Sequence, residues 1–194
     1  KANNQAILLS DSEYILLLNP DTVVEEDTFT RIIDFMDSHP KAGGLGVRML
    51  DGKGKFLPES KRGLPTPSVA FYKIFGLSRI FPKSKRFGQY HLGYLSEFET
   101  NEVDILSGAF MLMRSEALDK VGLLDEAFFM YGEDLDMSYR IKKLGYKIIY
   151  YPKYSVLHLK GKSGVKSAED TVQSKTHFYF YDAMKIFYKK NYSK

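Results

Sequence analysis

The sequence contains no cysteine and no tryptophan. Without cysteine the chain forms neither disulfide bonds nor thiolate metal sites, which suits an intracellular protein. It also has no run of about 18 apolar residues, the length that a membrane-spanning helix needs, so we expect no transmembrane segment. The first residues form neither a signal peptide nor a translation start, and we therefore expect the sequence to begin inside a longer protein.

The composition is that of a globular domain, with 194 residues, 44% of them hydrophobic and 27% charged. The net charge of +4 is unevenly distributed, with basic clusters at Lys53, Lys61 and Arg62, at 83–86, and from Lys160 onward. Such clusters indicate either solvated surface or a surface that meets anionic lipid or a diphosphate-bearing substrate. Nucleic acid is not expected as a partner, since no recognition motif accompanies the charge.

Apolar patterns in the first half predict alternating strands and helices. The short apolar run Tyr14–Leu18 predicts a buried parallel strand, and Ala42–Leu50 predicts a second strand. Between them, an amphipathic helix is expected over 26–39, ended by Pro40, with an apolar face formed by Phe29, Ile32, Ile33 and Met36. Residues 58–100 then lose clear periodicity and contain four of the seven prolines. We interpret them as a functional or mobile loop region in which 69–75 forms one or two helical turns.

The second half returns to strands at 103–106 and 110–113, followed by a short helix that Ser115 caps and Gly122 ends. A further helix is expected over 131–144, with Met137, Ile141 and Leu144 facing inward. Strands follow at 147–151 and 155–159, and a last helix covers 168–194. This alternation predicts one α/β domain over 1–194, three-layered, with a mostly parallel sheet.

Three features carry candidate chemistry. Asp21 follows a predicted strand, where ligands bind in open α/β sheets, and its carboxylate suits Mg²⁺ or Mn²⁺. Alternatively, Thr22 and Glu25 form a capping box. Glu133, Asp134 and Asp136 begin a helix whose positive end favours ionised carboxylates, one of which could act as a base, or they are ordinary first-turn acids. His158, before a glycine-bearing basic loop, is either a metal ligand or a structural histidine.

Taken in order, these features resemble family 2 glycosyltransferases of the GT-A fold, most closely the rhamnosyltransferase-like branch. The matching stretches are LLLNPDT at 16–22, LSGAFML at 106–112, VGLLDEAFFMYGEDLD at 121–136 with Arg140, Tyr151-Pro152, and His158-x-x-Gly161-x-Ser163. Each stretch is short, but their order and spacing together are specific.

The resemblance implies a role for each matching residue. Asp21 corresponds to the last acid of the metal motif and His158 to a histidine that joins the metal, while Asn19 replaces the first acid and is assigned to substrate binding. Asp134 corresponds to the catalytic base, with Glu133 beside it. Substrate contacts are further expected from Ser107, Gly108, Ala109, Asp136 and Arg140.

The implied reaction is an inverting transfer of a sugar, rhamnose in this branch, from a nucleotide-diphosphate donor to a glycan or lipid-linked acceptor. Its setting would be polysaccharide synthesis in the cell envelope, in the cytoplasm or peripherally on the inner face of the plasma membrane. The resemblance also implies that roughly 70–90 residues binding the nucleotide precede this sequence. The fold would then be N-terminally truncated, with 58–100 on the acceptor side and a sheet edge that a homodimer could cover.

Two alternatives remain at this stage. A sugar-phosphate nucleotidyltransferase shares this fold class and the need for a metal, and a non-catalytic domain could keep the fold without turnover. The processive synthases of the family are not expected, because their Gln-x-x-Arg-Trp signature requires the tryptophan that is missing here.

Overall fold

The computed structural model of the chain describes residues 1–159 and 169–192. At its centre lies a six-stranded sheet in the order β1 (Tyr14–Leu18), β5 (Phe110–Arg114), β3 (Ala42–Leu50), β6 (Lys147–His158) and β2 (Thr22–Val24), with β4 (Asn101–Val103) also paired to β6. The β3–β6 pair is parallel, and the other described pairs are antiparallel. The sheet is therefore mixed rather than mostly parallel.

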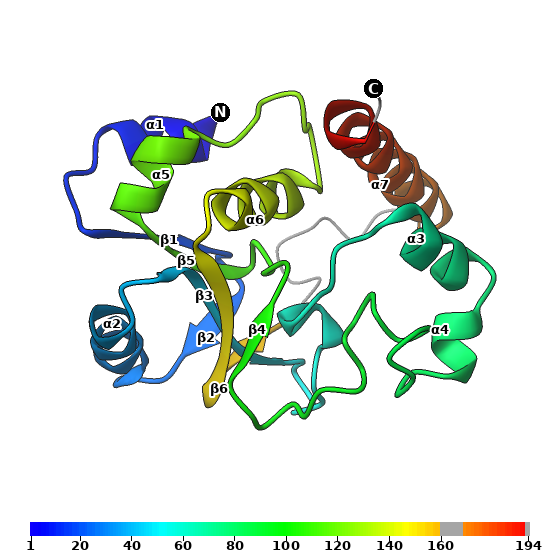
Figure 1. Cartoon of the computed structure of the whole chain (residues 1–194), viewed down its shortest axis with the longest axis horizontal. Coiled ribbons are helices and arrows are strands. Elements are labelled where there is room, and N and C mark those ends of the chain that lie inside the picture. The colour runs from blue at the N-terminus through cyan, green and yellow to red at the C-terminus, as the bar shows by residue number, and fades with distance from the viewer. Residues whose placement is uncertain (160–168, 193–194) are drawn as a thin grey trace.

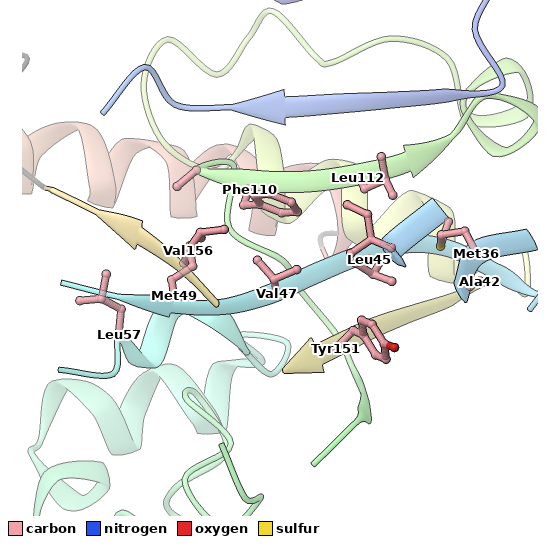
Figure 2. Packing of buried hydrophobic residues seen from close by; sticks show 12 residues of the cluster. Met36, Ala42, Leu45, Val47, Met49, Leu57, Phe110, Leu112, Tyr151 and Val156 are labelled. Carbon is pink, nitrogen blue, oxygen red and sulfur yellow. The ribbon is translucent and has the colours of Figure 1, made fainter. Parts of the chain in front are cut away.

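Helices cover both faces of this sheet (Figure 1). On one face, Ile32 and Met36 of α2 (Thr28–Ser38) pack on a cluster that includes Leu45, Phe110 and Leu112 (Figure 2). On the other face, α5 (Ser115–Val121) and α6 (Glu133–Lys143) cover the sheet. Successive side chains of a strand point to opposite faces, so β5 supplies both clusters in alternation. The α/β, three-layer prediction is confirmed.

Several further helices lie outside the sheet layers. α1 (Ala2–Leu8) is attached through Asn4, whose side chain donates to the Leu124 carbonyl at 2.8 Å and accepts from the Leu124 amide at 3.0 Å. The 3₁₀ helix η1 (Pro58–Ser60), α3 (Pro67–Ile74) and α4 (Leu77–Ile80) fill the region predicted as a loop. α3 thus confirms the turns expected at 69–75.

The C-terminal helix α7 (Glu169–Asn191) confirms the prediction of a last helix. Ala183 and Phe187 pack it against a third cluster with Ile105, Phe128 and Leu135. None of the described helices is both long and apolar enough to cross a bilayer.

Two predictions about strands are wrong in detail. β1 is a half-buried strand at the end of the sheet and runs antiparallel to β5, because a short apolar run indicates burial and carries no information on strand direction. The strands expected at 147–151 and 155–159 form one strand, β6, interrupted by a bulge. Val47 pairs with Tyr151, but the next residue, Arg48, pairs with Ser155.

Some side chains also lie elsewhere than their spacing predicts. Leu144 ends α6 and is 49% exposed, and Phe29 and Ile33 of α2 are exposed as well. The regular spacing of apolar residues predicts a wider buried face than the structure has, because the neighbouring layer covers only the centre of that face. Ser115 does not cap α5. Its hydroxyl donates to the Ser12 carbonyl, and Arg114 holds the N-cap position.

Candidate active site

A cavity of about 570 Å³ opens where β1 and β6 end and α6 begins. Its wall includes most of the residues predicted to act in the site, although they are far apart in the sequence. These residues are Asn19, Asp21, Ser107, Gly108, Ala109, Glu133, Asp134 and His158.

Strand pairing brings Asp21 and His158 together. Thr22 is opposite His158 in the β2–β6 pair, and the Leu159 amide donates to the Asp21 carbonyl at 2.9 Å. The imidazole Nε2 of His158 lies 3.4 Å from Asp21 Oδ1 and 3.3 Å from Asn19 Nδ2. Because Thr22 belongs to a strand, the alternative of a capping box with Glu25 is wrong.

These side chains fit a divalent cation as part of its coordination. A carboxylate oxygen and an imidazole nitrogen 3.4 Å apart can both reach an ion about 2.1 Å from each. His158 Nδ1 is buried without a hydrogen-bond partner among the described residues. That part of the chain holds no cluster of three or more His, Cys, Asp or Glu side chains suited to a metal. The remaining coordination positions would therefore go to water and to phosphate oxygens, as is usual for Mg²⁺.

The backbone before α6 sets the position of the acidic pair. Tyr131 (φ 66°) and Gly132 (φ 87°) are both left-handed, and a Cβ on Gly132 would lie 2.8 Å from Phe128 Cδ1. Left-handed backbone at a non-glycine residue costs about 1–3 kcal/mol and is common at active sites. The turn starts α6 at Glu133, so that Glu133 and Asp134 lie on the cavity wall at the positive helix end.

Three N–H donors orient the carboxylate of Asp134. Oδ2 accepts from Arg62 Nη2 at 2.5 Å and from the Gly108 amide at 3.1 Å, and Oδ1 accepts from the Leu135 amide at 2.7 Å. A carboxylate has about four lone-pair positions for hydrogen bonds. One position is therefore left for a hydroxyl group that enters the cavity.

Arg62 is the site residue that the sequence analysis missed. It was grouped with Lys53 and Lys61 as part of a basic cluster, but its side chain is only 16% exposed. Besides Asp134, its guanidinium donates to the Leu106 carbonyl. The sequence offered only an indirect indication of this role. Two adjacent acidic residues at the start of a partly buried helix favour a positively charged side chain nearby.

Glu133 differs from Asp134 in its surroundings. Burial, followed by the charge of Asp134, raises the pKa of the Glu133 carboxyl. Its Oε2 atom is buried without a hydrogen-bond partner in the described part of the chain. A carboxyl group of this kind can donate a hydrogen bond when protonated and accept one when ionised.

Asp136 and Arg140, expected to contact substrate, do not line this cavity. Asp136 is fully buried and pairs with Arg140 at 2.7 Å and with Lys190 at 2.8 Å. Arg140 donates to the carbonyls of Val121 and Leu123, at 2.6 and 2.9 Å. Because Asp136 lies two residues after Asp134 in α6, the two side chains point in different directions, and Asp136 faces α7. Both residues therefore connect elements that support the site.

The loop 107–109 forms the cavity floor beside the acids. Phe110 donates to the Ser107 carbonyl at 3.0 Å, which makes a tight turn that points the Gly108 amide at Asp134. A Cβ on Gly108 would lie 3.6 Å from Asp134 Cβ and 3.9 Å from Glu133 Oε1, an ordinary contact distance. Gly108 thus leaves room for about one methyl group next to both carboxylates. Gly161 and Ser163 of the predicted motif, like Lys160 and Lys162, lie outside the described residues.

Aromatic and apolar side chains also line the cavity. Tyr90, Tyr131, Phe180, Met184 and Pro65 contribute to its wall. The Lys73 ammonium lies 3.4 Å from the centre of the Tyr90 ring and 4.9 Å from that of Phe180. The cavity is therefore lined by aromatic side chains as well as by charged ones.

Comparisons with known proteins agree with this geometry. The family model described as "Glycosyltransferase like family 2" matches residues 2–176. The N-acetylglucosaminyl-diphospho-decaprenol L-rhamnosyltransferase of Mycobacterium tuberculosis is 29% identical over 78% of this chain and 48% of its own length. Rhamnosyltransferase WbbL of Escherichia coli is 28% identical over 77% of this chain and 53% of its own length. The chain thus spans about half the length of these curated relatives.

Among solved structures, the crystal structure of GalNAc-T7 with UDP, GalNAc and Mn²⁺ is similar in fold. It aligns with a TM-score of 0.54 and 14% sequence identity, covering 82% of this chain and 30% of that chain. At this identity the likeness concerns the fold alone, and it confirms the expected GT-A-like architecture.

Proposed function

Because the chain belongs to glycosyltransferase-like family 2, we propose that its cavity transfers a sugar from a nucleotide-diphosphate donor to a glycan or lipid-linked acceptor. One observation supports the proposal most strongly. Asp21 and His158, whose side chains lie close enough to share a cation, line the same cavity as an oriented carboxylate, Asp134. Displacement of a diphosphate requires these two elements, a counter-charge for the leaving group and a base for the nucleophile.

In this proposal the donor sugar is rhamnose and the product enters cell-surface polysaccharide. The support is that two relatives found in the comparison are named as rhamnosyltransferases. One of these names includes a diphospho-decaprenol acceptor, and by analogy we propose a lipid-linked acceptor here. A lipid-linked acceptor would require the protein to work at a membrane surface, which we propose is the inner face of the plasma membrane.

Asp134 acts as the base in this mechanism. The acceptor hydroxyl occupies the lone-pair position that Arg62, Gly108 and Leu135 leave open. As the hydroxyl oxygen bonds to the anomeric carbon, its proton passes to the Asp134 carboxylate. The bond between that carbon and the diphosphate breaks on the opposite side, so the configuration at the anomeric carbon inverts.

Asp21 and His158 would hold Mg²⁺ or Mn²⁺, and the bound cation would neutralise the charge that develops on the leaving diphosphate. The leaving group then needs no protonation, so a single base is sufficient. Asn19, beside His158 Nε2, would orient the imidazole or contact the donor.

Arg62 and the Gly108 amide are positioning groups for the base. Both donate to Oδ2 of Asp134 and so fix the plane of the carboxylate before the acceptor binds. Glu133 and the aromatic wall would bind the acceptor. Burial raises the pKa of Glu133, which favours the protonated form that can donate a hydrogen bond to a sugar oxygen.

The test is a donor screen with dTDP-rhamnose, UDP-galactofuranose, UDP-glucose and UDP-GlcNAc, in the presence of Mg²⁺ or Mn²⁺. Asp134→Asn should lower kcat by about 10²–10⁴-fold and leave donor affinity unchanged. Asp119→Asn, an exposed aspartate of α5, is the matched control and should keep full activity. Unchanged turnover in Asp134→Asn would contradict the base assignment. Release of pyrophosphate from a nucleoside triphosphate and a sugar 1-phosphate would favour a nucleotidyltransferase instead.

A further inference from the structure

The helices α3 and α4 expose large apolar side chains to solvent. Phe71, Ile74 and Phe75 of the α3 region are 50%, 66% and 65% exposed, and Ile80 and Phe81 at the end of α4 are 66% and 51% exposed. Large exposed apolar patches are rare on monomeric proteins and mark interaction sites.

These side chains share one region of the molecule. Positions 71, 74 and 75 follow the i, i+3, i+4 spacing of a single helix face, and the rings of Phe71 and Phe75 lie 4.3 Å apart. α4 follows α3 directly and packs on it. Figure 1 shows both helices together at the side of the molecule away from α2. The core clusters of the domain do not include these five side chains.

The same region is strongly basic. Residues 60–96 contain no Asp or Glu. Two of the basic residues there have other roles, since Lys61 is buried and Arg62 pairs with Asp134. The exposed basic residues at the end of α4 and just after it are Arg79, Lys83, Lys85 and Arg86.

We propose that this combined surface binds an anionic lipid membrane. The membrane-binding surface is defined by the exposed apolar residues Phe71, Ile74, Phe75, Ile80 and Phe81 and by the basic residues Arg79, Lys83, Lys85 and Arg86. Apolar side chains that insert at the headgroup boundary, flanked by Lys and Arg, are the chemistry of peripheral membrane binding. The centre of a protein–protein interface, in contrast, is depleted of lysine.

The surface adjoins the cavity. Pro65 lines the cavity and lies two residues before the first residue of α3, and Lys73 of α3 packs over Tyr90 of the cavity wall. A membrane bound to α3 and α4 would therefore lie next to the part of the cavity lined by Pro65 and Tyr90. The role that we assign to this arrangement, presenting a lipid-linked acceptor to Asp134, rests on the proposed function.

The experiment measures binding to vesicles by flotation, comparing neutral phosphatidylcholine with the same lipid containing about one third phosphatidylglycerol. We expect binding to the anionic vesicles. Lys83→Ala with Lys85→Ala should weaken it roughly 30-fold, since each lysine contributes about 1 kcal/mol at an anionic surface. Ile74→Ser with Phe75→Ser should weaken it at least roughly tenfold, and this loss should persist at high salt, which screens the lysine contribution.

Two matched controls separate the surface from general charge and hydrophobicity. Lys53→Ala with Lys55→Ala removes the same charge from the exposed turn after β3, and Leu8→Ser with Leu9→Ser removes exposed apolar side chains from the last residue of α1 and the residue after it. Both controls should bind vesicles like the unmodified protein. Equal losses in the control and test variants, or no preference for anionic vesicles, would overturn the proposal. So would a change in sedimentation of Ile74→Ser/Phe75→Ser with unchanged vesicle binding, because the surface would then join two copies of the chain.

A transfer assay with a water-soluble acceptor analogue distinguishes this inference from the proposed function. The membrane-surface variants should retain that activity, whereas Asp134→Asn should lose it. If no donor supports transfer while vesicle binding behaves as described, the proposed function fails and the membrane surface stands.

Discussion

The pairing of Arg62 with Asp134 provides the most direct test of the site. Arg62→Met removes the guanidinium and leaves Asp134 with two backbone donors, the amides of Gly108 and Leu135. The two side chains of the pair are 16% and 14% exposed. Removing one partner of a buried ion pair costs roughly 3–5 kcal/mol. Since the cavity admits water to Asp134, we expect a loss of about 2–3 kcal/mol in the free energy of unfolding.

The same substitution should lower kcat/KM by about 100-fold, which corresponds to about 2.7 kcal/mol of transition-state stabilisation. The reason is that Arg62 fixes the plane of the carboxylate that receives the proton. Arg62→Lys keeps the charge but cannot donate to both Asp134 and the Leu106 carbonyl in the planar geometry of arginine. It should therefore restore stability more fully than activity.

A double-mutant cycle measures this coupling. Urea denaturation of Arg62→Met, Asp134→Asn and the double variant should give a coupling energy of about 1–3 kcal/mol. The matched control is Arg48→Met, because Arg48 pairs with Glu97 at 2.7 Å with the same side-chain exposure as Arg62. Its effect on stability should add to that of Asp134→Asn, and its kcat should remain unchanged. Additive effects for Arg62 as well would refute the reasoning.

Three further predictions concern other residues. Burial, with the charges of Lys73 and Arg62, lowers the pKa of His91 from 6.5 to about 4. As pH falls, the unfolded chain therefore protonates His91 before the folded chain does, so the free energy of unfolding should decrease by up to about 3 kcal/mol between pH 6.5 and 4. Urea titrations of His91→Gln should show a smaller decrease over the same pH range. An equal decrease in the variant would contradict the assignment of this effect to His91. Asp21→Asn should weaken Mn²⁺ binding at least roughly tenfold in calorimetric titrations, an effect that would be absent if Asp21 were not a ligand. Gly108→Ala should fold normally by circular dichroism but raise the KM for acceptor, because its methyl group fills space beside the acids, and an unchanged KM would place the acceptor elsewhere.

Local sequence patterns predicted the layers, and they singled out several residues that the fold brings to one cavity. The spacing of Ile32 and Met36 indicated the buried face of α2, and both side chains are fully buried. Asp21 follows β1, Asp134 lies in the first turn of α6 and His158 ends β6, and ligand sites in α/β folds occur at such ends of elements. Their positions could therefore be predicted from the ends of the elements alone.

Features that depend on distant contacts could not be predicted in this way. The direction of β1 depends on β5, nearly a hundred residues later, and nothing in its own five residues distinguishes the two directions. The roles of Arg62 and Asp136 depend on which side chains the fold brings opposite them. Arg62 meets Asp134 in the cavity, whereas Asp136 meets Arg140 and Lys190 away from it. A charged residue that forms an ion pair in the fold has the same charge and can have the same spacing in the sequence as one that forms none, so the sequence does not distinguish them.

The interruption of β6 has a consequence for the chemistry. In β6, residues 152–154 are three extra residues between Tyr151, the partner of Val47, and Ser155, the partner of Arg48. An odd number of extra residues reverses the side of the sheet toward which every later side chain of the strand points. His158 is buried beside Asp21, while its neighbour Leu157 is 36% exposed. If this segment were one residue shorter, leucine would occupy the ligand position and the imidazole would face outward. The length of three residues within a strand thus decides whether the cavity can hold a cation.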